Sequence, residues 1–210
     1  MGFMEQIVKQ CRKPTGLFGT FVGIGMNRGH SRLRRWGLSH ISIKPNESIL
    51  DVGCGGGKGI KDLARISSSG KVYGIDYSDQ MVRLARRINK RSIEKGHVEI
   101  MHGSVSSLPF LDGTFNLVTA FEACYFWPNL IEDLKEIKRV LKPGGTLLIA
   151  NEAYKHEKFE KRNSKWAKWG HMMLHTPEEY RNLFTEAGYM GIELDDVPEK
   201  NWIAVIAKKE

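Results

Sequence analysis

The chain has 210 residues, a hydrophobic content of 41% and a formal net charge of +8. This length is enough for one α/β domain, and no apolar run approaches the roughly 18 residues of a membrane span, which argues against stable membrane insertion. The three cysteines are widely spaced and form no C-x-x-C pair, so neither a disulfide framework nor a zinc site is expected. We therefore expect a cytoplasmic protein.

The first part of the chain, residues 1–44, is basic and is predicted to form a cap. Residues 1–48 hold eight Lys or Arg and two acidic residues, a net charge of +6. Residues 1–13 have a weak helical pattern, whereas residues 14–29 are rich in Gly, Phe and Met without a long pattern. Such an apolar segment forms either a lid over a site or a peripheral layer on the core. His30 is a candidate for the wall of a substrate pocket.

A short helix is predicted next, because Ser31 can cap it and apolar residues follow on one side. Its arginines, Arg32, Arg34 and Arg35, are expected to face water for the most part. Residues 151–176 are also basic, with six Lys or Arg against three acids. The two basic regions either keep the surface soluble or attract an acidic acceptor, nucleic acid or an anionic membrane.

The central motif is residues 49–59, with the sequence ILDVGCGGGKG. Its apolar run predicts a buried strand, its glycines predict a tight turn, and the helical spacing of later apolar residues predicts a helix. Open α/β sheets bind ligands at such turns, at the carboxyl ends of their strands. A P-loop is excluded because Gly59 stands where a hydroxyl is needed. A dinucleotide fingerprint is imperfect, because Lys58 stands at its third glycine position.

Two acidic residues indicate which ligand the turn holds. Asp51 lies just before the turn, where a carboxylate repels a pyrophosphate but suits an ammonium or a sulfonium ion. S-adenosylmethionine (SAM) carries both cations and no phosphate. Asp76 ends a second predicted strand, 19 residues after Gly57, near the spacing at which an acid meets ribose hydroxyls. Ser78 is the better cap for the next helix, which leaves Asp76 free for the ribose.

Strands and helices alternate through the rest of the chain, as in α/β proteins. The remaining strands are predicted at residues 97–101, 115–120, 146–150, 189–197 and 202–208, and the main helices at 59–66, 78–95, 130–141 and 177–187.

Four motifs together resemble the class I SAM-dependent methyltransferases, and most closely the small-molecule enzymes related to the ubiquinone and menaquinone methyltransferases. They are Asp51 to Gly57, Gly74-Ile75-Asp76, Leu108-Pro109-Phe110 and Arg139 to Gly145. The resemblance covers roughly residues 45–208. It implies a Rossmann-like, doubly wound sheet of seven mostly parallel strands with the last strand antiparallel, an N-terminal helical cap in residues 1–44, and a methyltransferase domain in residues 45–210.

The resemblance also implies SAM as the cofactor and S-adenosylhomocysteine as the product. The residues that it places at the cofactor are Asp51, Gly53, Cys54, Gly55, Asp76, Tyr77, Met81, Ser104, Val105, Phe121 and Glu122. At Ser104 the resembling families usually have a carboxylate that meets the adenine amino group. A hydroxyl accepts that hydrogen bond less strongly.

Residues 121–128 leave the fourth predicted strand and point into the crevice. They lack the Asn/Asp-Pro-Pro-aromatic motif of many DNA and RNA amino-methyltransferases, which counts against methylation of base amino groups. Three consecutive aromatic residues line an apolar acceptor pocket, contact the sulfonium through cation–π attraction, or pack against the next helix. Tyr125 and Trp127 are the candidates for the pocket.

The insertion at residues 151–176 alternates basic and aromatic residues. This pattern predicts an amphipathic lid, with binding of single-stranded nucleic acid as the alternative. His171 and His175 have helical i, i+4 spacing, but no third ligand accompanies them, so no metal site is predicted.

The sequence thus predicts a methyltransferase that moves the SAM methyl group to a small-molecule acceptor, as a monomer or a homodimer. The alternatives are an RNA methyltransferase that uses both basic regions, a non-catalytic SAM-binding module, and an NAD(P)-dependent oxidoreductase, which Asp51 and Lys58 disfavour. A general base is needed only if the acceptor must lose a proton early. No single catalytic residue is predicted, and the candidates for such a base are Glu122, Tyr125, His30, His156 and His171.

Overall fold

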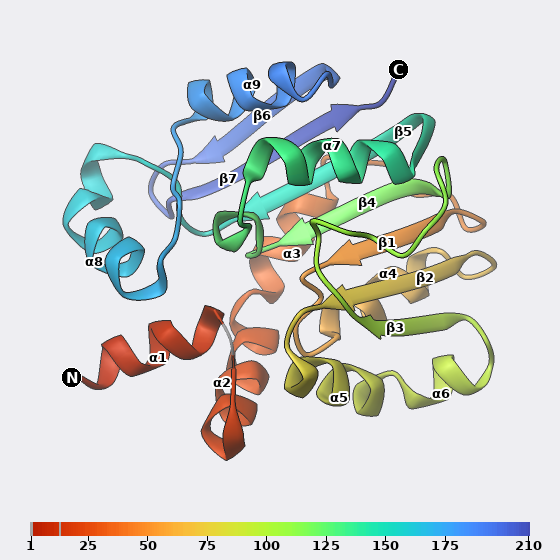
Figure 1. The fold of residues 1–210 in the computed structure, drawn as a ribbon, viewed down its shortest axis with the longest axis horizontal. Coiled ribbons are helices and arrows are strands. Elements are labelled where there is room, and N and C mark those ends of the chain that lie inside the picture. Colours follow the sequence, from red (N-terminus) through yellow and green to blue (C-terminus); the bar gives the residue numbers. More distant parts are fainter. Residues whose placement is uncertain (1, 13) are drawn as a thin grey trace.

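The computed structural model describes residues 2–12 and 14–210. The described part of the chain is built around a sheet of seven strands in the order β3-β2-β1-β4-β5-β7-β6 (Figure 1). Neighbouring strands from β3 to β5 are parallel, whereas β7 is antiparallel to both β5 and β6. This confirms the predicted fold class. The strands are β1 (Ser48–Val52), β2 (Lys71–Asp76), β3 (Val98–His102), β4 (Phe115–Phe121), β5 (Leu141–Asn151), β6 (Met190–Val197) and β7 (Trp202–Lys208).

Helices cover both faces of the sheet, and each face has its own apolar core. Because side chains alternate along a strand, Ile49 faces one core and Leu50 the other. The first core is closed by α3 (Ser31–Leu38), α4 (Lys58–Ile66) and α5 (Asp79–Ile88), and the second by α7 (Leu130–Val140) and α9 (Pro177–Glu186). The shorter elements are α6 (Lys90–Glu94), η1 (Cys124–Phe126) and η2 (Glu157–Phe159).

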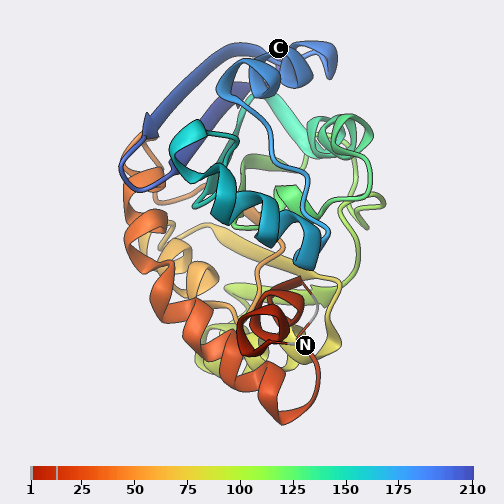
Figure 2. The ribbon, with the colours of Figure 1, turned by 90° about the vertical axis from the view of Figure 1, so that its left-hand side faces the viewer.

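Three further helices lie beyond the carboxyl ends of the parallel strands (Figures 1 and 2). They are α1 (Phe3–Arg12), α2 (Gly16–Gly29) and α8 (Glu160–Gly170), and α1 packs against both of the others. We call these three helices the cap. None of the described helices is long and apolar enough to cross a bilayer.

The helix α2 corrects the prediction that residues 14–29 form no long element. Its five glycines lower intrinsic helix propensity, so the local pattern was poor. One of them is required by packing, since a Cβ on Gly23 would lie 2.7 Å from Cε of Met81 in α5. Close packing on α5 therefore stabilises a helix that the isolated segment would not form.

The predicted helix ends are partly confirmed. Ser78 caps α5 and accepts a hydrogen bond from Met81 N, and Thr176 forms a capping box at the start of α9. The predicted Ser31 cap is wrong, because His30 is the N-cap residue of α3 and no side chain caps that helix. The helix expected over residues 78–95 is interrupted at Asn89, whose side-chain amide donates to Gly57 O and Ala85 O.

Candidate active site

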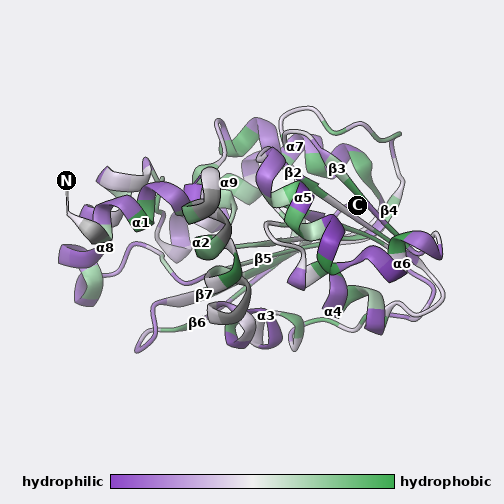
Figure 3. Cartoon of the chain, turned by 90° about the horizontal axis from the view of Figure 1, so that it is seen from below, coloured by the Kyte–Doolittle hydropathy of each residue, from purple (hydrophilic) through white to green (hydrophobic). Residues whose placement is uncertain are grey.

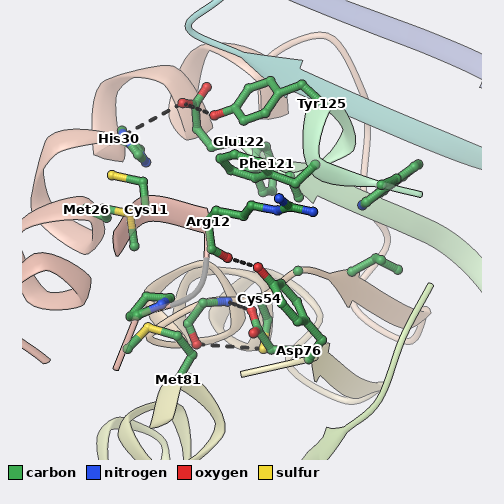
Figure 4. A pocket seen from close by; sticks show the side chains of 18 of the residues that line it. Cys11, Arg12, Met26, His30, Cys54, Asp76, Met81, Phe121, Glu122 and Tyr125 are labelled. Atoms are coloured by element: carbon green, nitrogen blue, oxygen red, sulfur yellow. Dashed lines mark hydrogen bonds and ion pairs between the residues drawn. The ribbon is translucent and has the colours of Figure 1, made fainter. Parts of the chain in front are cut away.

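A cavity of about 610 Å³ lies between the carboxyl ends of the parallel strands and the cap (Figure 4). Every residue that the sequence placed at the cofactor or the acceptor lines this cavity. The set consists of Asp51, Gly53, Cys54, Gly55, Asp76, Tyr77, Met81, Ser104, Val105, Phe121, Glu122, His30, Tyr125 and Trp127. Because lining the cavity does not show what each residue would contact, their individual roles remain predictions.

The glycine turn forms a cavity wall without side chains. Gly53, Gly55 and Gly57 have φ values of 70°, 52° and 78°, in the left-handed region that favours glycine. A Cβ on Gly53 would lie 2.6 Å from Cβ of Ala123, whereas nothing lies within 4 Å of a Cβ on Gly55. Gly53 thus permits close packing against the segment after β4, and Gly55 leaves its backbone open to a ligand.

The strand register brings Asp51 to the cavity beside a hydroxyl donor. Asp51 in β1 is aligned with Thr119 in β4, and Thr119 Oγ1 donates to Asp51 Oδ1 at 2.7 Å. The carboxyl is 3% exposed, and this burial raises its pKa to about 7. A cation bound next to Asp51 would favour the ionised form, so the site suits the ammonium group predicted from the sequence.

Asp76 is less free than the sequence suggested. Its Oδ2 accepts from Gly55 N at 2.8 Å and its Oδ1 accepts from Ser78 N at 2.9 Å. Burial raises the pKa of Asp76, and these two hydrogen bonds oppose that effect. The carboxylate therefore ties the glycine turn to the start of α5. Because each carboxylate oxygen has two lone pairs, Asp76 can still accept a hydrogen bond from a ribose hydroxyl.

Arg34 was expected to face water, and this was wrong. It is 6% exposed and lines the cavity, because α3 packs Leu33, Arg34 and Gly37 inward. Arg34 Nη2 lies 3.8 Å from Asp62 Oδ2 in α4. Burial lowers the pKa of Arg34, while the charges of Asp62 and Asp51 raise it.

A second polar cluster lies just after β4. Glu122 has a φ of 58°, which is rare for a residue with a side chain and concentrated at functional sites. Its Oε2 accepts from the Tyr125 hydroxyl at 2.8 Å, and its Oε1 accepts from Glu152 N. Burial raises the pKa of Glu122 to about 7, against the effect of both hydrogen bonds. The structure thus presents a carboxyl that titrates near neutral pH.

His30 and Glu152 complete this cluster, and Figure 4 shows His30 facing Glu122. His30 Nε2 lies 3.8 Å from Glu122 Oε2 and 3.9 Å from Glu152 Oε2, too far for direct hydrogen bonds. Burial lowers the pKa of His30 and raises that of Glu152. Among the described residues, this trio is the group that could supply three metal ligands, with ligand atoms within 4.8 Å of one another. Its spacing equally accommodates one polar atom of an acceptor.

Apolar side chains from the cap form one part of the cavity wall. Sequence reasoning found a weak helical pattern in residues 1–13 but placed none of their side chains at the cavity, whereas it did predict a lid in residues 151–176. The apolar cap residues that line the cavity are Met4, Ile7, Val8, Met26 and Trp166, joined by Met172 just after α8. Aromatic residues of η1 and its C-terminal neighbour Trp127 line it too. The cavity therefore combines polar walls with apolar ones.

Known proteins are similar to this chain in sequence and in fold. The model of a methyltransferase domain matches residues 50–149. A demethylmenaquinone methyltransferase of Bacillus mycoides is 34% identical over 120 residues, covering 57% of this chain and 50% of the relative. One of Staphylococcus saprophyticus is 26% identical, covering 90% of each chain. The chain thus spans about half the length of most curated relatives that it matches, but 90% of the Staphylococcus saprophyticus protein.

The structure of a SAM dependent methyltransferase from Aquifex aeolicus has a similar fold, with a TM-score of 0.73, 20% identity and full coverage of both chains.

Proposed function

We propose that this chain methylates a small, largely apolar acceptor that must lose a proton. The chain belongs to the class I SAM-dependent methyltransferases and is related to the quinone methyltransferases. The observation that carries this proposal is the composition of one cavity. The glycine turn and its two acids, a carboxyl that titrates near neutral pH, and the apolar cap residues all line it. The name of the relatives supports an aromatic quinol as the acceptor class.

SAM supplies a methyl group on a sulfonium sulfur, which is activated for transfer when it is bound. The residues of the cavity fit this cofactor. Asp51 would pair with its ammonium group, Asp76 would accept from its ribose hydroxyls, and the glycine turn would contact its methionine part. The residues that would border the adenine are Met81, Ser104 and Val105.

Arg34 would bind the carboxylate of the cofactor. Its guanidinium is buried at the cavity wall, and a Cβ on Gly59 would lie 3.5 Å from Arg34 Cδ and 3.0 Å from Asp51 Oδ2. The cation of Arg34 and the anion of Asp51 therefore flank the start of α4. An amino acid group, with one positive and one negative end, is complementary to this pair. The first amides of α4 add to the attraction for a carboxylate.

Replacing Arg34 with Met is expected to weaken binding of S-adenosylhomocysteine by about 10- to 100-fold, the effect of one hydrogen-bonded charge pair. Binding of 5′-methylthioadenosine, which has no carboxylate, should stay unchanged. Titration calorimetry with both ligands measures this, with Arg34→Lys as a partial rescue and the exposed Arg32→Met on the same helix as the matched control. Equal losses for both ligands would assign Arg34 a structural role instead.

Glu122 is placed to accept the proton of the acceptor. The cofactor would supply the methyl group, and the acceptor atom that receives it would give up its proton. The acceptor proton moves to the Glu122 carboxylate, which the Tyr125 hydroxyl holds in place. Apolar cap residues exclude water and align the two reactants.

Transfer of labelled methyl from SAM tests the proposed function. With 1,4-naphthoquinol under reducing conditions, we expect label in the organic extract, and with total RNA we expect none in the nucleic acid. Label in RNA alone would overturn the proposal in favour of an RNA methyltransferase. No transfer to either, with S-adenosylhomocysteine still bound, would favour a binding module. Loss of transfer with EDTA would indicate that His30, Glu122 and Glu152 bind a metal ion instead.

A further inference from the structure

The cap presents an apolar surface beside the cavity. Phe21 is 72% and Phe18 42% exposed on α2, and Met4 is 51% exposed on α1. The two phenylalanines are three residues apart, so they lie on one side of α2. Met4 also lines the cavity, and its helix α1 packs against α2. We call Met4, Phe18 and Phe21 the cap patch.

Packing within the protein does not explain why α2 is apolar on this side. Its sequence, GLFGTFVGIGMNRG, has no acidic residue. The opposite side already packs on the core, where Gly23 contacts Met81 and Met26 lines the cavity. A helix at a water-facing surface normally has polar residues on its outer side. The outer side of α2 instead carries two aromatic rings, which indicates an apolar partner.

The charge of the cap indicates which partner this is. Residues 2–29, which include α1 and α2, contain four Lys or Arg and one acidic residue, a net charge of +3, and α8 adds four basic residues against one acid. The helices α1, α2 and α8 lie together at one end of the molecule (Figure 3). Exposed aromatic rings within a strongly basic region are typical of segments that lie in the interface of an anionic bilayer.

We propose that the cap patch docks this protein peripherally on an anionic lipid surface. Phe18 and Phe21 enter the headgroup layer, and the basic residues of the cap contact the lipid phosphates. The bilayer is favoured over RNA because Met4, which has no ring to stack on a base, is exposed on the cap as well. An apolar acceptor dissolved in the bilayer then meets the cavity at the docked surface. The docking itself does not depend on which acceptor is methylated.

Sedimentation with lipid vesicles tests this proposal on the full chain. We expect binding to vesicles of phosphatidylcholine with phosphatidylglycerol, little binding to phosphatidylcholine alone, and a decline with added salt. The double variant F18S/F21S should bind the anionic vesicles about 100-fold more weakly, or about tenfold for each ring. The matched control is Leu111→Ser, which removes a side chain that is 83% exposed in the turn before β4, at the opposite end of the sheet.

Two further measurements keep the outcome interpretable. Neither phenylalanine lines the cavity, so both variants should bind S-adenosylhomocysteine like the wild type, which confirms that they are folded. Methylation of a water-soluble acceptor should likewise be unchanged, so failure of docking and failure of the proposed reaction are distinguishable. The proposal is overturned if F18S/F21S binds anionic vesicles as tightly as the wild type does. It is also overturned if the cap binds RNA and no vesicle.

Discussion

Replacing Glu122 with Gln is expected to lower kcat for methyl transfer by about 10²- to 10⁴-fold, the usual contribution of a general base. The amide keeps the size of the side chain but cannot take a proton. Because burial raises the pKa of Glu122 to about 7, kcat/KM for the acceptor should rise through neutral pH in the wild type as the carboxyl ionises. That rise should be absent in Glu122→Gln. Initial rates at saturating SAM, across pH values from about 5 to 9, measure both effects.

Other charged groups surround Glu122, so the pH profile needs a control. His30 faces it from the junction of α2 and α3 and Glu152 from the end of β5, and Arg162 of α8 acts on it over a longer distance. Asp51 also has a pKa raised to about 7, but saturating SAM would keep it ionised through the bound ammonium. Tyr125→Phe keeps the carboxylate and removes its hydroxyl donor. It should therefore move the inflection to higher pH without abolishing activity. A full rate in Glu122→Gln would refute the base assignment.

Glu122→Gln should also change the stability of the protein, and the raised pKa of Glu122 gives the direction of that change. The pKa of Glu122 is raised from 4.5 to about 7, so the folded protein binds this proton more tightly than the unfolded chain does. At pH values below the pKa of Glu122 in the unfolded chain, the carboxyl is protonated in both states and does not lower the stability of the fold. As the pH rises from there to about 7, ionisation of Glu122 is favoured in the unfolded chain, which destabilises the folded state progressively by at most about 3 kcal/mol. Thermal unfolding of Glu122→Gln should therefore occur at a higher temperature than the wild type at about pH 8, and at a similar temperature near pH 5. Activity and stability then change in opposite directions, which separates catalytic loss from misfolding.

The sequence predicts best what is encoded by neighbouring residues. The apolar run before the glycine turn, the turn itself and the helix after it are local signals, and the structure has all three. The seven mostly parallel strands and the antiparallel β7 were implied by the family resemblance, and the fold confirms them. The comparisons support the predicted methyltransferase family, and SAM as the cofactor stays a proposal. The assignment of Asp51 and Asp76 to the cofactor stays a prediction, although both line the cavity.

What the sequence could not predict depends on contacts between distant segments. The glycine-rich α2 forms because Gly23 packs on Met81, and the segment itself gives no helical pattern. Arg34 is turned inward toward Asp62 and Asp51, which lie on other elements. His30, Glu122 and Glu152 meet only because the cap folds over the ends of β4 and β5. No spacing along the chain indicates these encounters.

Replacing Asp76 with Ala is expected to weaken binding of S-adenosylhomocysteine by at least about 100-fold. Two losses combine, because the ribose hydroxyls lose a charged acceptor and the glycine turn loses the tie from Gly55 N to α5. Asp76→Asn keeps one acceptor oxygen and should give an intermediate affinity. The matched control is Asp79→Ala, an exposed acid in the first turn of α5, which should bind like the wild type. Calorimetry measures the affinities, and thermal unfolding without ligand measures the structural part. If Asp76→Ala lowers the unfolding temperature but binds normally, the carboxylate only braces the turn and the ribose is held elsewhere.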